Sequence, residues 1–229
     1  DTTIDGEPVP ARPESIVEVD GQLVVGLSRL AFLPDFSVLG AQGQLAVVDA
    51  GLNVSAYRLP DGLENCGAVR PVPDAPGSVL VACRGNGSGE ALAASSGLVE
   101  LSIGTSTITI RHLWRPSDGD ERPVAVSSAT PITSGRVVAV ASGDFTAGTP
   151  DVVYDVDLAG GTATEITSSD GPFELGGPAW DPATGTLLVP DAVDGVEIWT
   201  DDGGAFTGGD PIAIDDASGL PPRSVVLVR

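Results

Sequence analysis

The chain has 229 residues, of which 41% are apolar, so it is long enough for one folded domain with a sizeable core. It contains 32 acidic and 11 basic residues, a formal net charge of -21, which argues against binding to nucleic acid or to an anionic membrane surface. No apolar run of about 18 residues is present, so the sequence predicts no membrane span. The 30 glycines and 19 prolines favour many short strands over long helices.

Two residue types are missing from the sequence. It contains no methionine, not even at position 1, and all 11 basic residues are arginines. The first absence is typical of a processed or mature exported product, and the second of a GC-rich bacterial gene. We therefore expect a bacterial protein that is secreted, periplasmic or on the cell surface.

A short pattern recurs four times along the chain: a glycine, a polar residue and then an apolar run. A turn signal precedes each copy, as is typical of a strand that leaves a tight hairpin. The copies are residues 21–25, 77–81, 135–139 and 185–189, which begin 56, 58 and 50 residues apart. The sequence therefore contains an internal repeat of about 50 residues.

Each copy is accompanied by three further alternating or apolar segments. One precedes the glycine, at 15–19, 67–73, 125–133 and 177–181. A second follows at 43–49, 97–103, 151–158 and 195–200, and a third at 54–59, 107–113, 162–167 and 211–214. Units of four short strands without a helix are the sequence form of β-propeller blades, so we expect an all-β fold of this type. The expected divisions are a lead segment, 1–12, then blades at 13–60, 66–114, 124–167 and 176–214, and the start of a further blade at 220–229.

The two ends of the chain resemble each other. Residues 222–228 match residues 13–19, so the chain ends on the first strand of a fifth unit. A propeller needs a closed ring, and the lead segment is too short to supply three missing strands. The last strand could lie at the edge of a four-bladed ring. We favour a ring completed by a second polypeptide or by an N-terminal part absent from this chain, with a contact through Ser224, Val225, Val226, Leu227 and Val228.

The repeats resemble the YVTN/lactonase-like group of seven-bladed propellers. Residues 178–189 and 43–49 carry the resemblance, which extends over nearly the whole chain. It implies a propeller architecture and a choice among lactonases, surface proteins and ligand-binding scaffolds. This chain departs from the group in lacking part of the ring.

The two cysteines lie in one expected hairpin. If its turn centres on residues 74 and 75, Cys66 and Cys83 face each other across the strands, within reach of a disulfide. A disulfide suits an exported protein, and two separate buried thiols are the alternative. The spacing does not suit a redox or metal site.

Few residues are suited to catalysis. The only histidine, His112, falls on an outermost strand, which disfavours a Ser-His-Asp triad and excludes a zinc site made of three histidines.

Residues 137–222 contain 16 acidic residues and no basic one. A solvated acidic surface is the simplest interpretation. Two loop clusters resemble oxygen ligands for Ca²⁺, and they consist of Asp118, Asp120 and Glu121, and of Asp191 and Asp194.

Three functions remain open. The repeat and the scarcity of catalytic residues favour an exported, non-catalytic propeller that acts as a binding or scaffold subunit of an extracellular or cell-surface assembly. The enzymatic alternative is a lactonase-like or metal-assisted hydrolase that uses carboxylates in the central channel. The third is a structural module stabilised by Ca²⁺.

Overall fold

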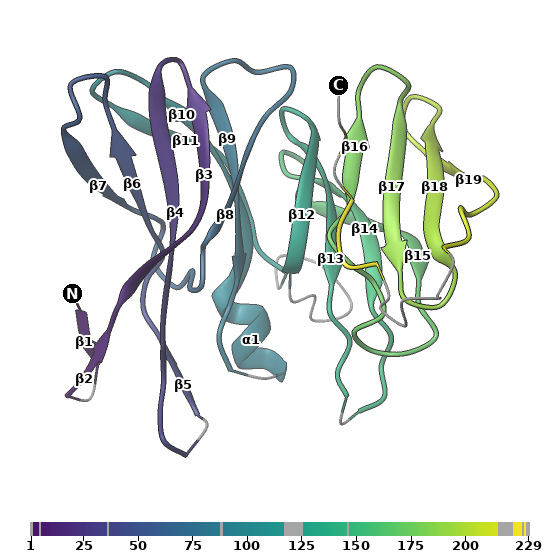
Figure 1. The fold of residues 1–229 in the computed structure, drawn as a ribbon, viewed down its shortest axis with the longest axis horizontal. Coiled ribbons are helices and arrows are strands. Elements are labelled where there is room, and N and C mark those ends of the chain that lie inside the picture. The colour runs from purple at the N-terminus through teal and green to yellow at the C-terminus, as the bar shows by residue number, and fades with distance from the viewer. Residues whose placement is uncertain are drawn as a thin grey trace.

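The structure, a computed structural model, describes residues 2–4, 6–35, 37–87, 89–116, 126–145, 147–214, 222–225 and 227. Four antiparallel sheets of successive strands stand side by side in an arc, with the first on the left and the fourth on the right in Figure 1. These sheets are the four expected blades, and the fold is a partial β-propeller.

Blades 1 and 2 come from the N-terminal half of the chain. Blade 1 consists of β3 (Ala11–Val19), β4 (Gln22–Phe32), β6 (Gln44–Val48) and β7 (Val54–Arg58), with β5 (Val38–Gly40) paired to the far end of β4. Blade 2 consists of β8 (Ala68–Pro71), β9 (Ser78–Arg84), β10 (Ser96–Ile103) and β11 (Ile108–Trp114).

Blades 3 and 4 follow in the same order. Blade 3 consists of β12 (Val126–Thr133), β13 (Arg136–Ala141), β14 (Val152–Asp157) and β15 (Thr162–Ser168). Blade 4 consists of β16 (Ala179–Asp181), β17 (Thr186–Asp191), β18 (Gly195–Asp201) and β19 (Phe206–Gly208). In every blade the first strand is the one nearest the middle of the molecule in Figure 1. We call the face formed by β3, β8, β12 and β16 the inner face.

The repeated glycines are the last residues of the tight turn between the first and second strands of each blade. Gly21, Gly77, Gly135 and Gly185 all have a positive φ, between 66° and 80°. Side chains rarely adopt this backbone conformation, so glycine is the residue that suits these turns. The spacing of the repeat in the sequence therefore sets the spacing of the blades.

Three predicted details are wrong. The helix α1 (Gly89–Ser95) interrupts blade 2, where no helix is expected, because Glu, Leu and Ala in this segment favour helix. The fourth strand of blade 4 is β19, whereas the predicted segment 211–214 contributes only an isolated bridge between Ile212 and Val196. The β8–β9 register is also shifted by one residue, with Ala68 opposite Ala82.

The lead segment forms a small sheet of its own. β1 (Thr2–Ile4) pairs with β2 (Glu7–Val9), and Val9 packs with Ala31 and Ala41 near the β4–β5 hairpin. Both hairpins project below the blades in Figure 1. The lead segment therefore adds no strand to a blade.

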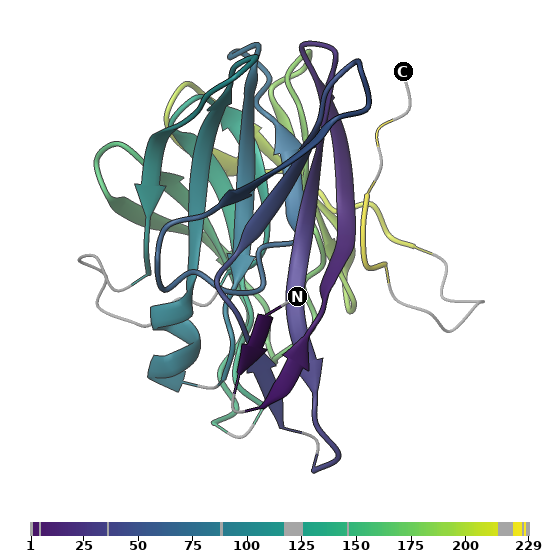
Figure 2. The same cartoon turned by 90° about the vertical axis from the view of Figure 1, so that its left-hand side faces the viewer.

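The ring is open. Blades 1 and 4 lie at opposite ends of the longest axis in Figure 1, and in Figure 2 the C-terminal segment stands to one side of the blades. Among the helices of the described chain, none is long and apolar enough to cross a membrane.

Candidate functional site

Each pair of neighbouring blades shares an apolar cluster. Blades 1 and 2 enclose one that includes Val24, Val79 and Val81, and blades 2 and 3 one that includes Leu80 and Val137. Blades 3 and 4 enclose a third, around Val138, Leu187 and Val189. All of these residues are at most 1% exposed, so the three interfaces form the core of the molecule.

Successive residues of the repeated pattern point to opposite faces of each blade. The third and fifth residues of the repeated pattern point toward the preceding blade, and the fourth points toward the following blade. In blade 1 the third and fifth residues are Leu23 and Val25, and the described residues before β3 form a small hairpin rather than a blade that could cover them. Leu23 is 39% exposed, although its counterparts Val79, Val137 and Leu187 are fully buried.

The middle of the outward face of blade 1 is apolar, while Glu18, Gln44 and Arg58 point to the same side nearer its ends. Ile16 on β3 lies opposite Val25, and Val54 on β7 lies opposite Val48, so these side chains point to the same side as Leu23. Ile16 and Val54 are 59% and 69% exposed. We define the blade 1 end face as Ile16, Leu23, Val25, Ala46, Val48, Val54 and Ala56.

Blade 4 has a smaller apolar outward face. Leu188 and Ile198 lie opposite each other on β17 and β18, and both are half-buried. The counterparts of Leu188 in blades 1 to 3, Val24, Leu80 and Val138, are at most 1% exposed. Both ends of the arc therefore display side chains that are buried wherever the chain supplies a neighbouring blade.

The described part of the predicted contact segment lies beside blade 4. The Gly177 N–H donates to the carbonyl of Arg223 (3.0 Å), and Ser224 forms a parallel bridge to Gly177. The Arg223 guanidinium donates from Nη1 to the Phe173 carbonyl at 2.6 Å. Val225 is half-buried and Leu227 is 37% exposed, while Val226 and Val228 lie outside the described residues.

The structure joins Cys66 and Cys83 in the predicted disulfide. Their arrangement differs from the prediction, because Cys66 precedes β8 and forms an antiparallel bridge with Leu27 of blade 1. The hairpin turn closes through a hydrogen bond from the Val72 N–H to the Ser78 carbonyl at 3.1 Å, which shifts the facing positions by one residue. Both cysteines are fully buried in the cluster between blades 1 and 2.

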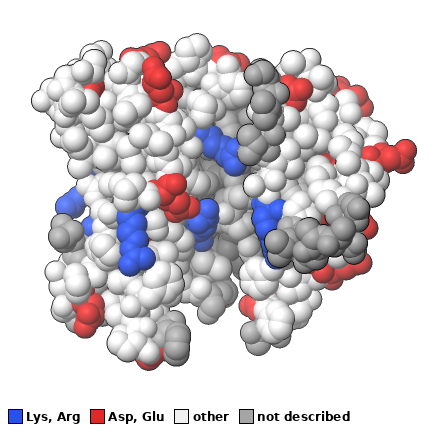
Figure 3. All heavy atoms as spheres, in the orientation of Figure 1, with Lys and Arg blue, Asp and Glu red and all other residues white. Residues whose placement is uncertain are grey.

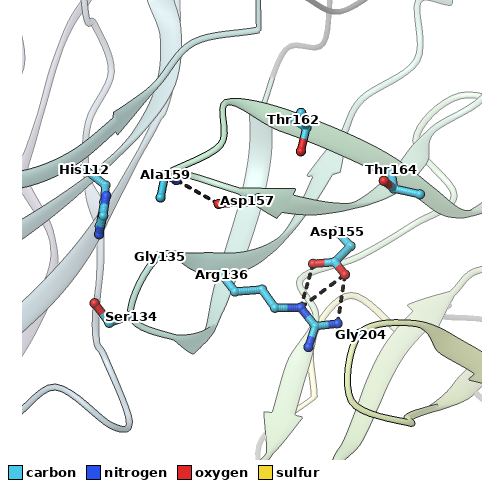
Figure 4. Close-up of a pocket in the computed structure, with 10 residues that line it drawn as sticks. All are labelled: His112, Ser134, Gly135, Arg136, Asp155, Asp157, Ala159, Thr162, Thr164 and Gly204. Atoms are coloured by element: carbon cyan, nitrogen blue, oxygen red, sulfur yellow. Dashed lines mark hydrogen bonds and ion pairs between the residues drawn. The ribbon is translucent and has the colours of Figure 1, made fainter.

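A polar pocket of about 570 Å³ lies beside the turn between β12 and β13 (Figure 4). Arg136 on its wall donates to Asp155 of blade 3 (2.8 Å) and to Asp201 of blade 4 (2.6 Å), and its guanidinium lies 5.0 Å from the Phe206 ring centroid. The hydrogen bonds that Asp155 accepts from the guanidinium raise the pKa of Arg136 further above its ordinary value. This arginine therefore fastens blade 4 to blade 3.

A buried carboxylate on the same side fastens blade 2 to blade 3. Glu100 is 1% exposed and accepts hydrogen bonds from the Ser134 hydroxyl (2.7 Å) and the Gly135 N–H (2.8 Å). Arg111 lies 3.4 Å from it. His112, on the outermost strand β11 as predicted, is half-buried and lines the pocket. The charged groups around this pocket thus link neighbouring blades. The Ser134 hydroxyl donates its hydrogen bond to Glu100.

The predicted calcium ligands are not assembled in the described residues. Asp118, Asp120 and Glu121 lie outside them. Asp191 is buried, and its Oδ1 accepts the N–H groups of Val193 (2.6 Å) and Asp194 (2.9 Å), which shapes the β17–β18 turn. Within the described ranges no three His, Cys, Asp or Glu side chains gather as a metal site would require. Calcium binding stays a prediction.

The sequence analysis did not predict the blade 1 end face. It also did not predict that Arg136 and Glu100 link neighbouring blades. The end face was visible in the repeat, because Leu23 and Val25 align with positions that are buried in the other blades. The contacts of Arg136 with Asp201 and of Glu100 with Ser134 carried no such signal, because each joins residues of two different blades.

Comparison with known proteins supports the fold. No family model and no curated protein matches the sequence. Among solved structures, the β-propeller domain of Cps50 (Swd1) from Myceliophteria thermophila is similar at 13% identity and a TM-score of 0.53 over 82% of this chain. An acylaminoacyl peptidase from Pyrococcus horikoshii is similar at 11% identity and a TM-score of 0.50 over 86% of this chain. The chain spans 54% of the first structure and 32% of the second, so it corresponds to part of each.

Proposed function

We propose that this chain is an exported, non-catalytic part of a β-propeller that acts as a binding or scaffold subunit, and that a second polypeptide completes its ring. The blade 1 end face carries the proposal. Two of its side chains, Leu23 and Val25, occupy repeat positions that are fully buried in blades 2, 3 and 4. A sheet that is apolar on both faces is typical of a sheet covered on both sides.

Covering this face would be strongly favourable. Full burial of a side chain such as Ile16, Leu23 or Val54 is worth about 1.5–3 kcal/mol relative to full exposure. Left open, a row of apolar residues on a sheet is a site of aggregation. A partner that presents an apolar sheet face, as each blade here presents to the next, has the shape and chemistry that the end face requires.

The C-terminal segment supports a contact at the other end of the arc. Blades contain an even number of antiparallel strands, so the first strands of neighbouring blades run parallel. The parallel bridge between Ser224 and Gly177 supports a course for this segment as the first strand of a following blade. We infer that the partner adds the other strands of that blade, with main-chain hydrogen bonds giving much of the affinity.

Two finer points belong to the same proposal. Export from a bacterial cell is supported by the Cys66–Cys83 disulfide, since disulfides persist in oxidising compartments. Similarity to the YVTN/lactonase-like group is supported by the repeated segments 43–49 and 178–189.

The test is the mass and composition of the native particle, measured by native mass spectrometry. We expect a particle heavier than 23.0 kDa that contains a second polypeptide rich in strands. With that partner purified, Leu23→Glu should weaken binding by about tenfold or more, because a charge would be buried in an apolar interface. Deletion of residues 220–229 should also weaken binding.

Val193→Glu is the matched control. Val193 is 67% exposed on the β17–β18 turn, away from the blade 1 end face, so this variant should bind the partner as wild type does. A native particle of 23.0 kDa that stays monomeric, or equal binding by Leu23→Glu and Val193→Glu, would contradict the proposal.

A further inference from the structure

Arg70 differs from most of the arginines in the chain. It lies on β8, the first strand of blade 2, directly opposite Leu80. Because paired residues point to the same side of a sheet, its side chain leaves β8 toward blade 3, as that of Leu80 does. Arg70 therefore extends from the inner edge of blade 2 into the space between β8 and β12.

Arg70 is exposed but not fully hydrated. Within the described residues it forms no hydrogen bond or ion pair, and its side chain is accessible to solvent. Desolvation by the surrounding protein nevertheless lowers the pKa of Arg70 from its ordinary value. Both properties are expected of a guanidinium on the wall of a hollow, where protein replaces part of its water without supplying a partner.

Other arginines of this molecule are already engaged. Arg136 pairs with two aspartates, Arg111 lies beside Glu100, and Arg115 donates to the Asp61 carbonyl. The side chains of Arg12 and Arg58 form no hydrogen bond or ion pair within the described residues either, but Arg12 lies at the start of β3 and Arg58 on the outermost strand β7 of blade 1, and both are exposed. Arg70 thus combines an unused guanidinium with a position in the middle of the inner face.

The inner face has more positive charge than the chain as a whole. Figure 3 shows basic side chains around a hollow near the middle of this face, with acidic ones mostly toward its edges. Arg84 reaches from β9 to Glu14 of blade 1 (2.7 Å) and to the Ser127 carbonyl of β12 (2.9 Å). Arg223 adds a third guanidinium beside blade 4. The first strands of the blades also carry Glu14, Glu18 and Asp181, and Glu14 is paired with Arg84, which leaves Arg70 as the guanidinium without a partner among the described residues near the middle of this face.

We propose that the inner face binds a small anionic ligand through its carboxylate or phosphate group, with Arg70 as the main contact. The planar guanidinium matches both groups with two parallel hydrogen bonds, which lysine does not offer. Arg84 and Arg223 raise the local potential that attracts the ligand.

The overall negative charge does not prevent such binding. At physiological ionic strength, charges more than about 8 Å away are largely screened, so the arginines nearest the ligand dominate. A bound anion would also give Arg70 the partner that the protein does not provide. This inference is independent of the proposed partner, because the ligand would bind the 229-residue chain alone.

The experiment is isothermal titration of the full chain with inorganic phosphate, and separately with succinate, each against chloride at equal ionic strength. Saturable binding of at least one anion is expected, and the two arms distinguish a phosphate site from a carboxylate site. Arg70→Gln should lose about tenfold or more in affinity, since hydrogen bonds between charged groups are among the strong ones. Arg70→Lys should lose less, because it keeps the charge but not the fork.

Arg58→Gln is the matched control, with the same change in charge on the outermost strand of blade 1, and it should bind as wild type does. Unfolding temperatures of the variants show whether each remains folded. Absence of saturable binding to both anions, or equal affinities of Arg70→Gln and Arg58→Gln, would overturn the proposal.

Discussion

Blades 2 and 3 are covered by an apolar neighbour on both faces, whereas blades 1 and 4 are covered on one face only. The side chains hardly differ in chemistry. Leu80 in blade 2 and Leu188 in blade 4 occupy the same repeat position, yet Leu80 is 1% exposed and Leu188 is half-buried. The apolar pattern is thus the same at the ends as in the middle, and only the presence of a neighbour differs.

The largest expected effect separates these two leucines. Leu80→Ala should lower the free energy of unfolding by about 2–5 kcal/mol, because it removes buried contacts and leaves a cavity. Leu188→Ala should cost only about 1 kcal/mol in the isolated chain, since part of that side chain is already in water. Urea denaturation of both variants measures the difference. Equal losses would show that blade 4 is as well covered as blade 2.

The disulfide links β9 of blade 2 to the segment before β8, where Cys66 forms a backbone bridge with Leu27 of the end blade 1. Replacing both by serine should lower the free energy of unfolding by about 2–4 kcal/mol, chiefly by freeing the unfolded chain. Chemical denaturation measures it, with reduced wild-type protein as the control for the two serines. If reduced and oxidised wild type are equally stable, the disulfide does not hold blade 1 in place.

Arg136 fastens the other end blade, through Asp155 and Asp201. Arg136→Gln should cost about 1.5–3 kcal/mol, the range for hydrogen bonds to charged groups, and it should loosen blade 4 more than blade 2. Hydrogen exchange of amides in β17 and β10 would compare the two blades. Equal exchange in both blades of the variant would contradict a local role.

The same ion pair gives a pH dependence. Burial alone would raise the pKa of Asp201, but the hydrogen bonds and charge of Arg136 outweigh it and hold this pKa below its ordinary value. A depressed folded pKa means that the ionised carboxylate stabilises the fold above the unfolded pKa, about 4. That stability is lost as the pH falls through the lower folded pKa. The difference in stability between wild type and Asp201→Asn should therefore shrink below about pH 4, and a constant difference would argue against the pair.

Calcium should have the smallest effect, and it would act on an end blade. If Asp191 and Asp194 bind Ca²⁺, millimolar Ca²⁺ should raise the unfolding temperature more than Na⁺ at equal ionic strength, because a ligand of the folded state stabilises by mass action. Asp194→Asn should remove the difference. Equal shifts with the two salts would leave these residues as part of a solvated acidic surface.

The sequence by itself determined the repeat, and with it most of the fold. Glycines such as Gly21 and Gly135 mark turns that need a positive φ, and the apolar runs after them alternate between the two faces of a sheet. These are local properties with fixed spacing, so they predict four blades of four strands. They also predicted a disulfide, although the one-residue shift of the β8–β9 register depends on how the turn closes.

Only the tertiary structure decided which side chains meet. Arg136 and Asp201 are 65 residues apart, Ser134 and Glu100 are 34 apart, and no spacing in the chain connects them. The arc also decides that Leu23 is exposed while its repeat counterparts are buried. Burial and partnership depend on packing between blades, which a pattern within one blade does not encode.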